Sequence, residues 1–243
     1  MVTLTKNKNS KIIANQVIDL EIKALKSLKK SLNKNFDKAV NAIVNCQSKI
    51  ILCGVGKSGL IASKIASTMS SVGSPSFSLS ANDCLHGDLG SISKKDLLII
   101  ISNSGKSEEL LPIIKFANRN KIKLIGIMSK KKSSLYKGSD IQILLPEVKE
   151  AGLGIVPTSS TSVQLAIGDA LAVAALNKKK FSKYDFSKLH PGGNLGKQLK
   201  TVEDLMVTKN KVPFINENKN LVSAIKIITS KKLGVLLLII RVA

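Results

Sequence analysis

The chain has 243 residues, of which 44% are hydrophobic, so it is long and apolar enough to bury a full core. Its formal net charge of +22 raises the question of a nucleic-acid partner, but among the 38 Lys and Arg residues only Arg119 and Arg241 are arginines. Because arginine and aromatic side chains carry much of nucleic-acid recognition, and aromatics are only 3% of this chain, we expect no nucleic-acid binding.

The cysteines and the termini carry no targeting or metal-binding pattern. Cys46, Cys53 and Cys84 are odd in number and lack the C-x-x-C spacing of zinc sites and redox motifs. Residues 1–11 are polar and lysine-rich, and no signal-peptide core follows them. The late apolar run Leu233–Ile240 is far shorter than the roughly 20 residues of a membrane span. We therefore expect a soluble cytoplasmic protein without membrane association.

In chain order, the sequence predicts a helical lead-in and then alternating strands and helices. Apolar residues recur at helical spacing through 12–46, with a second helical stretch over Phe36–Val44. The predicted strands are Lys49–Cys53, Ser76–Leu79, Asp96–Ile101, Lys123–Met128 and Ile141–Leu145, and the predicted helices between them are Ser58–Val72, Glu108–Asn118 and Ser133–Lys137. This alternation predicts an α/β fold with a parallel sheet covered on both faces, which binds ligands at the carboxyl ends of its strands.

The last third of the chain contains an apolar helix and a change of composition. Ser162–Leu176 is apolar on nearly every side and predicts a buried helix. We expect Asp169, which lies within it, to be a buried acid paired with a neighbouring group rather than a catalytic residue. After His190 the composition changes, so we expect one domain over 1–200 and a small module over 201–243.

The hydroxyl-rich loop Ser102–Ser107 follows an apolar strand and opens a helix at Glu108. Backbone N–H groups at a helix N-terminus attract anions, and the serine hydroxyls of this loop add donors without charge, so the loop is suited to a phosphate. Glu108 and Glu109 follow directly, which points to proton transfer on a bound sugar phosphate. A simple helix cap is the alternative interpretation.

The segment Gly54–Gly59 fits the pattern G-x-G-x-x-G, which is a weak signal alone. A dinucleotide site would want an acid about 20 residues further on, and Asp83 is a candidate for it. Lys57 separates the two interpretations, because a dinucleotide site needs no cation there. In a sugar-phosphate site its ammonium could polarise a carbonyl or neutralise phosphate. A solvated lysine at a helix start is the simpler alternative.

Two histidines and a further carboxylate stand beside glycine-rich or hydroxyl-rich segments. His86 and His190, the only histidines, are each flanked by glycines, so we expect loops that aim them at a ligand. Neither has a third ligand spaced for a metal site. Glu150 precedes the hydroxyl cluster Thr158–Thr161, which offers a second loop able to hold an anion.

In this order, the motifs GVGKSG, HGDLG, SNSGKSEE, PTSST with GDALA, and HPGGNLG resemble the sugar isomerase (SIS) domain family, and within it the D-arabinose 5-phosphate isomerases. The resemblance covers about residues 12–205. It implies a five-stranded parallel sheet between helices, flavodoxin-like or Rossmann-like, and a homotetramer with shared active sites. It also implies interconversion of D-ribulose 5-phosphate and D-arabinose 5-phosphate, which would supply 3-deoxy-D-manno-octulosonate synthesis.

The resemblance also implies which residues form the active site. Lys57, Glu109, Glu150 and His190 match catalytic positions, and a carboxylate would move a proton between adjacent carbons through an enediol, without metal or cofactor. Glu109 is our first choice for that base, ahead of Glu150. The residues expected to bind the phosphosugar are Gly56, Ser58, His86, Ser102, Asn103, Ser104, Ser107, Thr158, Ser159, Ser160 and Thr161.

The chain departs from the family pattern in two places. Between Glu150 and Pro157 it is one residue shorter, which bears on how Glu150 is aimed. Val202–Met206 resembles the start of a CBS module, but the segment 201–243 is too short to complete one, so we expect a partial CBS-like segment. Two alternatives remain: a sugar-phosphate sensor without catalysis, which would have no use for the glutamates, and an isomerase of another phosphosugar.

Overall fold

The computed structural model describes residues 9–190 and 202–240. The chain divides into two compact units, one that ends at Leu189 and one that begins at His190. The boundary that the sequence predicted, after residue 200, falls outside the described residues.

The first unit is built on a five-stranded sheet in which every neighbouring pair is parallel. Its strands are β1 (Ile50–Gly54), β2 (Ser76–Ser80), β3 (Leu97–Ile101), β4 (Lys123–Met128) and β5 (Ile141–Leu144), in the spatial order β2-β1-β3-β4-β5. All residues of β1 and β3 are buried, as their continuous apolar sequences require when both faces of a sheet are covered. The predicted α/β fold is confirmed.

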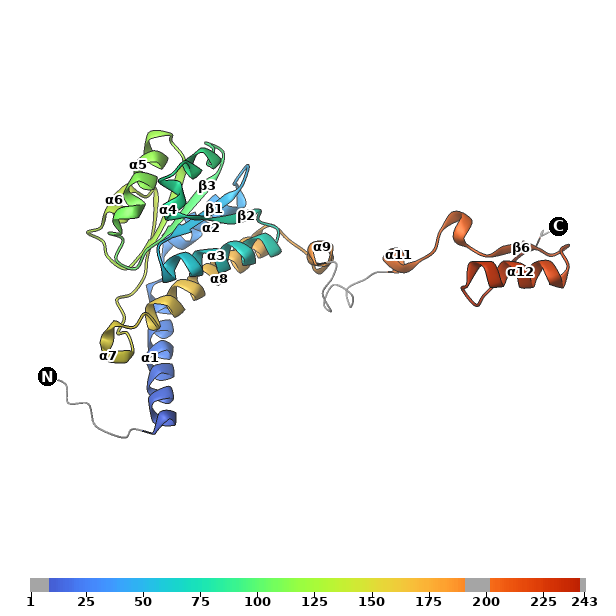
Figure 1. Cartoon of the computed structure of the whole chain (residues 1–243), viewed down its shortest axis with the longest axis horizontal. Coiled ribbons are helices and arrows are strands. Elements are labelled where there is room, and N and C mark those ends of the chain that lie inside the picture. Colours follow the sequence, from blue (N-terminus) through green and yellow to red (C-terminus); the bar gives the residue numbers. More distant parts are fainter. Residues whose placement is uncertain (1–8, 191–201, 241–243) are drawn as a thin grey trace. The chain divides into compact units, whose positions relative to one another are not determined.

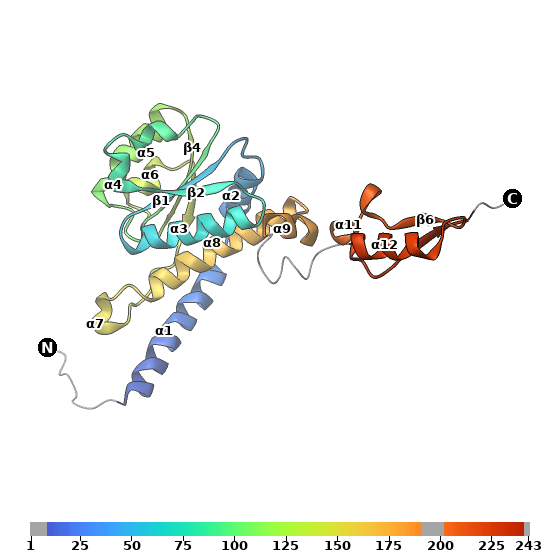
Figure 2. The same ribbon diagram turned by 45° about the vertical axis from the view of Figure 1, so that its right-hand side comes forward.

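Helices cover both faces of this sheet, as Figures 1 and 2 show. One apolar cluster lies between the sheet and α1, α2, α3 and α8, and a second lies between the other face and α4, α5 and α6. The helices of this unit are α1 (Ser10–Ser31), α2 (Lys34–Val44), α3 (Lys57–Ser71), α4 (Ala81–Cys84), α5 (Leu111–Arg119), α6 (Ser134–Gly138), α7 (Gly152–Ile155), α8 (Ser159–Lys178) and α9 (Lys183–Leu189), with 3-10 turns at Asp88–Ser91 and Glu108–Leu110.

The predicted elements are confirmed with small differences at their ends. The lead-in is two helices, separated where Asn33 leaves helical geometry and its side chain accepts a hydrogen bond from the N–H of Asn35 at 2.9 Å. The helix predicted over Glu108–Asn118 begins with a 3-10 turn, and the α-helical part starts only at Leu111, beside Pro112. The short helices α4, α7 and α9 were not predicted.

The apolar helix α8 differs from its prediction, because it is buried on one side only. Val163, Ile167 and Leu171 face the core, whereas Val173 is 52% exposed. Asp169 is correspondingly not a buried acid: its side chain is 41% exposed and pairs with Lys64 at 2.5 Å. Within 9–190 and 202–240, α8 is the one helix long and apolar enough to cross a membrane, and half of that apolar window is buried.

The second unit contains a small βαβ arrangement. Strands β6 (Phe214–Asn216) and β7 (Leu237–Ile239) pair in parallel, and α12 (Leu221–Lys231) connects them along the chain. A short helix α11 (Val202–Leu205) and a 3-10 turn at Lys209–Lys211 precede them. All three residues of β7 are exposed within this unit. Its identification as part of a CBS module stays a prediction.

The turn from β1 into α3 depends on a close backbone approach. A Cβ atom added at Gly54 would lie 2.8 Å from the carbonyl carbon and oxygen of Ser58, and one at Gly59 would lie 2.8 Å from the carbonyl oxygen of Gly54. These contacts are with backbone, which cannot rotate away as a side chain can. Two glycines of the motif are therefore required for packing strand against helix, whatever the site binds.

We predict that Gly54→Ala lowers the free energy of unfolding by about 1–3 kcal/mol, because the new methyl group must push β1 and α3 apart. Gly90→Ala is the matched control, since nothing lies within 4 Å of a Cβ built there, and it should stay within about 0.5 kcal/mol of the native protein. Urea unfolding of the three proteins measures both values. Equal losses for the two variants would contradict the prediction.

Candidate active site

A pocket opens at the carboxyl end of the sheet, where the chain runs from β1 to β2 on one side and returns to β3 on the other. In parallel sheets this change of direction leaves a crevice between the two neighbouring strands, and ligands bind there. The pocket has a volume of about 380 Å³. It is lined by Val55, Lys57, Ser58, Asn103, Glu150, Gly154, Ile155, Pro157, Ser160, Thr161 and Gln164.

The N-terminus of α3 contributes positive potential to this pocket. Lys57 is the first residue of the helix, and Gly56 before it has φ 56°, a conformation that glycine adopts without strain. No side chain caps this helix end, and no acidic residue lies in its first turn. Its backbone N–H groups, the helix dipole and the Lys57 ammonium are therefore available to an anionic ligand.

The loop Ser102–Ser107 presents Asn103 to the pocket and uses its serines to hold its own shape. Ser102 is 3% exposed, and its Oγ accepts a hydrogen bond from the N–H of Gly105 at 3.1 Å and lies 3.2 Å from the Oγ of Ser107. Ser129, after β4, donates from both its N–H (3.0 Å) and its Oγ (2.7 Å) to the Asn103 carbonyl. The Asn103 backbone is thus fixed from a neighbouring strand.

Glu150 is held by the start of α8. Its Oε2 accepts hydrogen bonds from the N–H of Thr158 at 2.9 Å, the N–H of Ser160 at 3.2 Å and the Oγ1 of Thr158 at 3.3 Å. Partial burial acts to raise the pKa of this carboxyl, but the hydrogen bonds from Ser160 and Thr158 together outweigh burial and lower the pKa below its ordinary value. Glu150 is therefore an ionised carboxylate at neutral pH, fixed in the wall of the pocket.

The pocket brings together six of the residues that the sequence singled out. Two come from the start of α3, one from the loop after β3, one from the segment before α7, and two from the first turn of α8. They are Lys57, Ser58, Asn103, Glu150, Ser160 and Thr161. Since these residues are separated by up to about a hundred positions in sequence, their meeting is a property of the fold.

The other predicted residues do not line this pocket. Glu109 lies half-buried on the 3-10 turn Glu108–Leu110, and His86 is exposed in the loop after α4. Thr158 precedes α8 and bonds Glu150, and Ser159 is the buried first residue of that helix. Ser102 and Ser107 bond each other, Ser104 lines a different pocket, and Gly56 precedes Lys57. His190 begins the second unit, and its role stays a prediction.

Sequence reasoning missed several lining residues, of which Gln164 is the most informative. It is 1% exposed in a predominantly apolar stretch of α8 and lines the pocket. Its signal was present in the sequence, because an amide among apolar residues at the start of a buried helix needs a partner. Gly154, Ile155 and Pro157 had no comparable signal.

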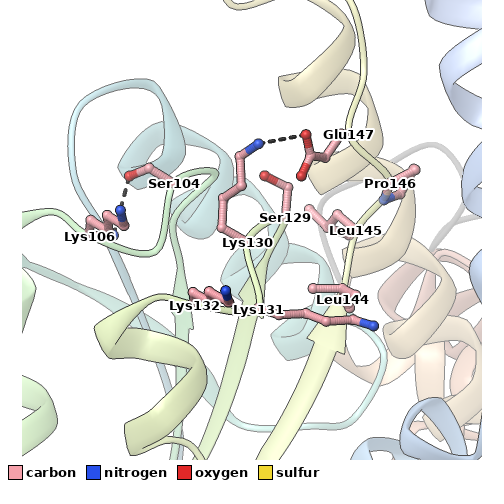
Figure 3. Close-up of a pocket in the computed structure, with 10 residues that line it drawn as sticks. All are labelled: Ser104, Lys106, Ser129, Lys130, Lys131, Lys132, Leu144, Leu145, Pro146 and Glu147. Carbon is pink, nitrogen blue, oxygen red and sulfur yellow. Dashed lines mark hydrogen bonds and ion pairs between the residues drawn. The ribbon is translucent and has the colours of Figure 1, made fainter.

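A second, larger pocket lies on the other side of the Ser102–Ser107 loop, at the carboxyl ends of β4 and β5 (Figure 3). It measures about 610 Å³ and has Lys106, Lys130, Lys131 and Lys132 among its lining residues. The one acid that lines it, Glu147, pairs with Lys130 at 2.6 Å. Four ammonium groups against one carboxylate give this side of the loop a positive field, which attracts anionic solutes.

The described residues offer no metal centre: among residues 9–190 and 202–240, no group of three or more His, Cys, Asp or Glu is placed to hold an ion. The groups that converge in the first pocket are instead an ammonium, a carboxylate, hydroxyls and amides. These groups are suited to binding a polar anion and to moving protons.

The hydrogen bonds to Glu150 predict a pH-dependent contribution to stability. Because its pKa is lower in the folded chain than in the unfolded one, that contribution is present above the unfolded pKa of about 4.3 and is lost as pH falls through the folded pKa. The variant Glu150→Gln keeps an acceptor but cannot titrate. We expect the stability advantage of the native protein over Glu150→Gln to shrink as pH is lowered from neutrality, in urea unfolding at several pH values. A difference independent of pH would contradict this.

Comparison with known proteins places this architecture in a family. The SIS domain model matches residues 43–174. An arabinose 5-phosphate isomerase of Yersinia pestis, KdsD, is 41% identical over 221 residues, which cover 90% of this chain and 67% of that protein. A solved structure of Escherichia coli CFT073 c3406 in complex with arabinose 5-phosphate has a TM-score of 0.73 and 36% identity, covering 76% of this chain and all of the other.

A second solved structure, described as a putative sugar-phosphate isomerase from Listeria monocytogenes, has the same TM-score of 0.73 with 30% identity, covering 77% of this chain and all of the other. The family model spans more than half of the chain and includes the sheet, the loop after β3 and the start of α8. The chain belongs to the SIS domain family.

Proposed function

We propose that this chain is an arabinose 5-phosphate isomerase, which interconverts D-ribulose 5-phosphate and D-arabinose 5-phosphate. The observation that carries the proposal is the pocket in which Lys57 and the ionised Glu150 meet the uncapped N-terminus of α3. The similarity to KdsD, and to c3406 with arabinose 5-phosphate bound, supports the same substrate class. The product would supply 3-deoxy-D-manno-octulosonate synthesis in the cytoplasm.

The reaction transfers one proton between neighbouring carbons. A carboxylate removes a proton from C1 of the open-chain ketose, the bonding electrons form the enediol, and the same group returns the proton to C2 while a hydroxyl proton passes from O1 to O2. Lys57 and the N–H groups at the start of α3 stabilise the negative charge that develops on the carbonyl oxygen, or hold the phosphate. No electron leaves the substrate, so the reaction needs no redox partner.

For the base, the geometry supports Glu150 more than Glu109, which was the first choice from the sequence. Glu150 lines the same pocket as Lys57 and is fixed by three hydrogen bonds. Glu109 lies on the 3-10 turn that follows the Ser102–Ser107 loop in the chain, and it does not line that pocket. A lowered pKa makes Glu150 a weaker base but keeps it in the form that accepts a proton.

We predict that Glu150→Gln lowers kcat by roughly 10²- to 10⁴-fold with KM little changed, because a positioned base is lost while the shape of the pocket is kept. Glu109→Gln is the matched variant and should cost less. The measurements are product identification by NMR after incubation with ribulose 5-phosphate, and exchange of deuterium from C1 into solvent. If Glu109→Gln abolishes the exchange and Glu150→Gln does not, the assignment passes to Glu109.

The same assay separates the alternatives. An isomerase of another phosphosugar would leave ribulose 5-phosphate unchanged, and a sensor would bind the sugar phosphate without exchanging its proton. The presence of Lys57 and Glu150 in one pocket favours catalysis over sensing, because binding alone does not require a carboxylate beside an anionic ligand.

The lysines around the second pocket add a positive field that raises the local concentration of a phosphorylated substrate.

A homotetramer with shared active sites is part of the proposal, and the surface of α1 supports self-association. Apolar side chains remain exposed along this helix although its opposite face packs on α8. They are Ile12, Ile13, Ile18, Ile22 and Leu25, together with Leu32 at the C-cap, each 38% exposed or more. Large apolar side chains left exposed along a helix are typical of a protein interface.

If neighbouring subunits complete each other's sites, two inactive variants should rescue each other. We predict that Lys57→Ala and His190→Ala are each nearly inactive, and that mixing them with subunit exchange restores part of the activity, because some sites then contain both native residues. Light scattering measures the oligomeric mass, and labelled subunits verify the exchange. Full exchange without any recovered activity would mean that each chain supplies its own site.

A further inference from the structure

Gln164 has an unusual environment for a buried side chain. It lies in the second turn of α8, is 1% exposed and lines the same pocket as Lys57 and Glu150. Among the described residues its Oε1 has no hydrogen-bond partner. Most buried polar side-chain atoms in proteins are hydrogen-bonded. An unpaired amide oxygen in the wall of a ligand pocket is therefore unusual and needs a physical reason.

Packing does not require an amide at this position. The neighbouring Val163 and Ile167 are 1% and 0% exposed in the apolar core, and a leucine or methionine at 164 would have about the same volume without leaving a polar atom unpaired. The other charged or amide side chain of the apolar stretch, Asp169, has a partner in Lys64 at 2.5 Å. Burying the amide oxygen of Gln164 therefore lowers the stability of the folded chain, because no neighbouring residue forms a hydrogen bond that offsets the loss of water.

We infer that Gln164 is a specificity-determining residue whose amide oxygen accepts a hydrogen bond from a hydroxyl group on the carbon chain of the bound sugar phosphate. This inference rests on the proposed function. A sugar hydroxyl can donate to Oε1, whereas a fully ionised phosphate has no proton to donate and is repelled by a carbonyl oxygen. The hydroxylated chain therefore lies against the Oε1 of Gln164, and the phosphate lies away from that atom.

The charges of the pocket agree with this orientation. Glu150 is ionised and, like Gln164, presents acceptor oxygens, so the part of the pocket formed by these two side chains disfavours phosphate. Lys57 and the uncapped start of α3 form the side that favours it. A wall built to pair with hydroxyl groups also discriminates against ligands that lack them, because its polar atom would then stay buried and unpaired.

The test uses Gln164→Met, which keeps the length of the side chain and removes the hydrogen bond. We expect KM for ribulose 5-phosphate to rise about 3- to 10-fold, the effect of one neutral hydrogen bond, while inhibition by inorganic phosphate is unchanged. The melting temperature should be equal to or higher than that of the native protein, because an unpaired buried amide is removed. Gln164→Leu provides a second variant should the first fail to fold.

Gln142→Met is the matched control, because the Nε2 of Gln142 already donates to the Ser139 carbonyl at 2.6 Å and the residue lies outside the pocket. It should lower the melting temperature and leave KM unchanged. An unchanged KM in both Gln164 variants would overturn the inference, and so would an equal loss of affinity for inorganic phosphate and for the sugar phosphate.

Binding measurements by calorimetry test the role of Gln164 even if the proposed isomerase activity is wrong. If the native protein does not isomerise ribulose 5-phosphate, titrations with arabinose 5-phosphate and with inorganic phosphate still measure the contact. The native protein should bind the sugar phosphate more tightly than phosphate, and Gln164→Met should reduce that preference about 3- to 10-fold. A preference of unchanged size in the variant would overturn the role of Gln164 regardless of activity.

Discussion

The position of β1 between β2 and β3 is the constraint on which the site depends. Because the chain leaves β1 toward β2 and then returns past it to β3, the segments that follow β1 and β3 diverge and leave a crevice at the carboxyl edge of the sheet. The start of α3 and Asn103 line that crevice from the two sides. The close approach of Gly54 and Ser58 brings α3 directly onto β1, so the helix N-terminus opens at the crevice rather than above it.

The helix α8 packs into the core and also contributes residues to the pocket. One of its sides packs into the core with α1, α2 and α3, and this packing fixes the position of the helix. Gly168 allows the approach, since a Cβ there would lie 2.2 Å from Cδ1 of Ile65 on α3. The rigid helix then carries Ser160, Thr161 and Gln164 into the pocket and fixes Glu150 through backbone N–H groups. A site built on a packed helix is positioned more accurately than one built on a free loop.

The two helix ends at the pocket have opposite electrostatic characters. The start of α8 is already occupied, because Glu150 accepts its N–H groups and neutralises its positive end. The start of α3 has no acidic residue and no side-chain cap, and it bears Lys57. An anionic group is therefore drawn to α3, while the start of α8 holds a proton-accepting carboxylate, Glu150, in the wall of the same pocket. The lysine-lined pocket beyond the Ser102–Ser107 loop adds to the positive field on the β4 side.

The sequence alone determined the fold class, because apolar runs such as Leu97–Ile101 have the length and continuity of strands buried on both faces, and helical spacing separates them. Its ordered motifs also identified the family, and the sequence singled out six of the residues that line the pocket. The tertiary structure decided which of these residues share a pocket, since that depends on contacts between segments far apart in the chain. It placed Glu150, which the start of α8 holds by hydrogen bonds, in the pocket, and it placed Glu109 on a 3-10 turn that does not line the pocket. It also showed that the serines of the Ser102–Ser107 loop bond one another, because hydroxyl groups pair with whichever donors folding brings near. Burial of Gln164 without a partner is likewise a property of packing, which no local pattern determines.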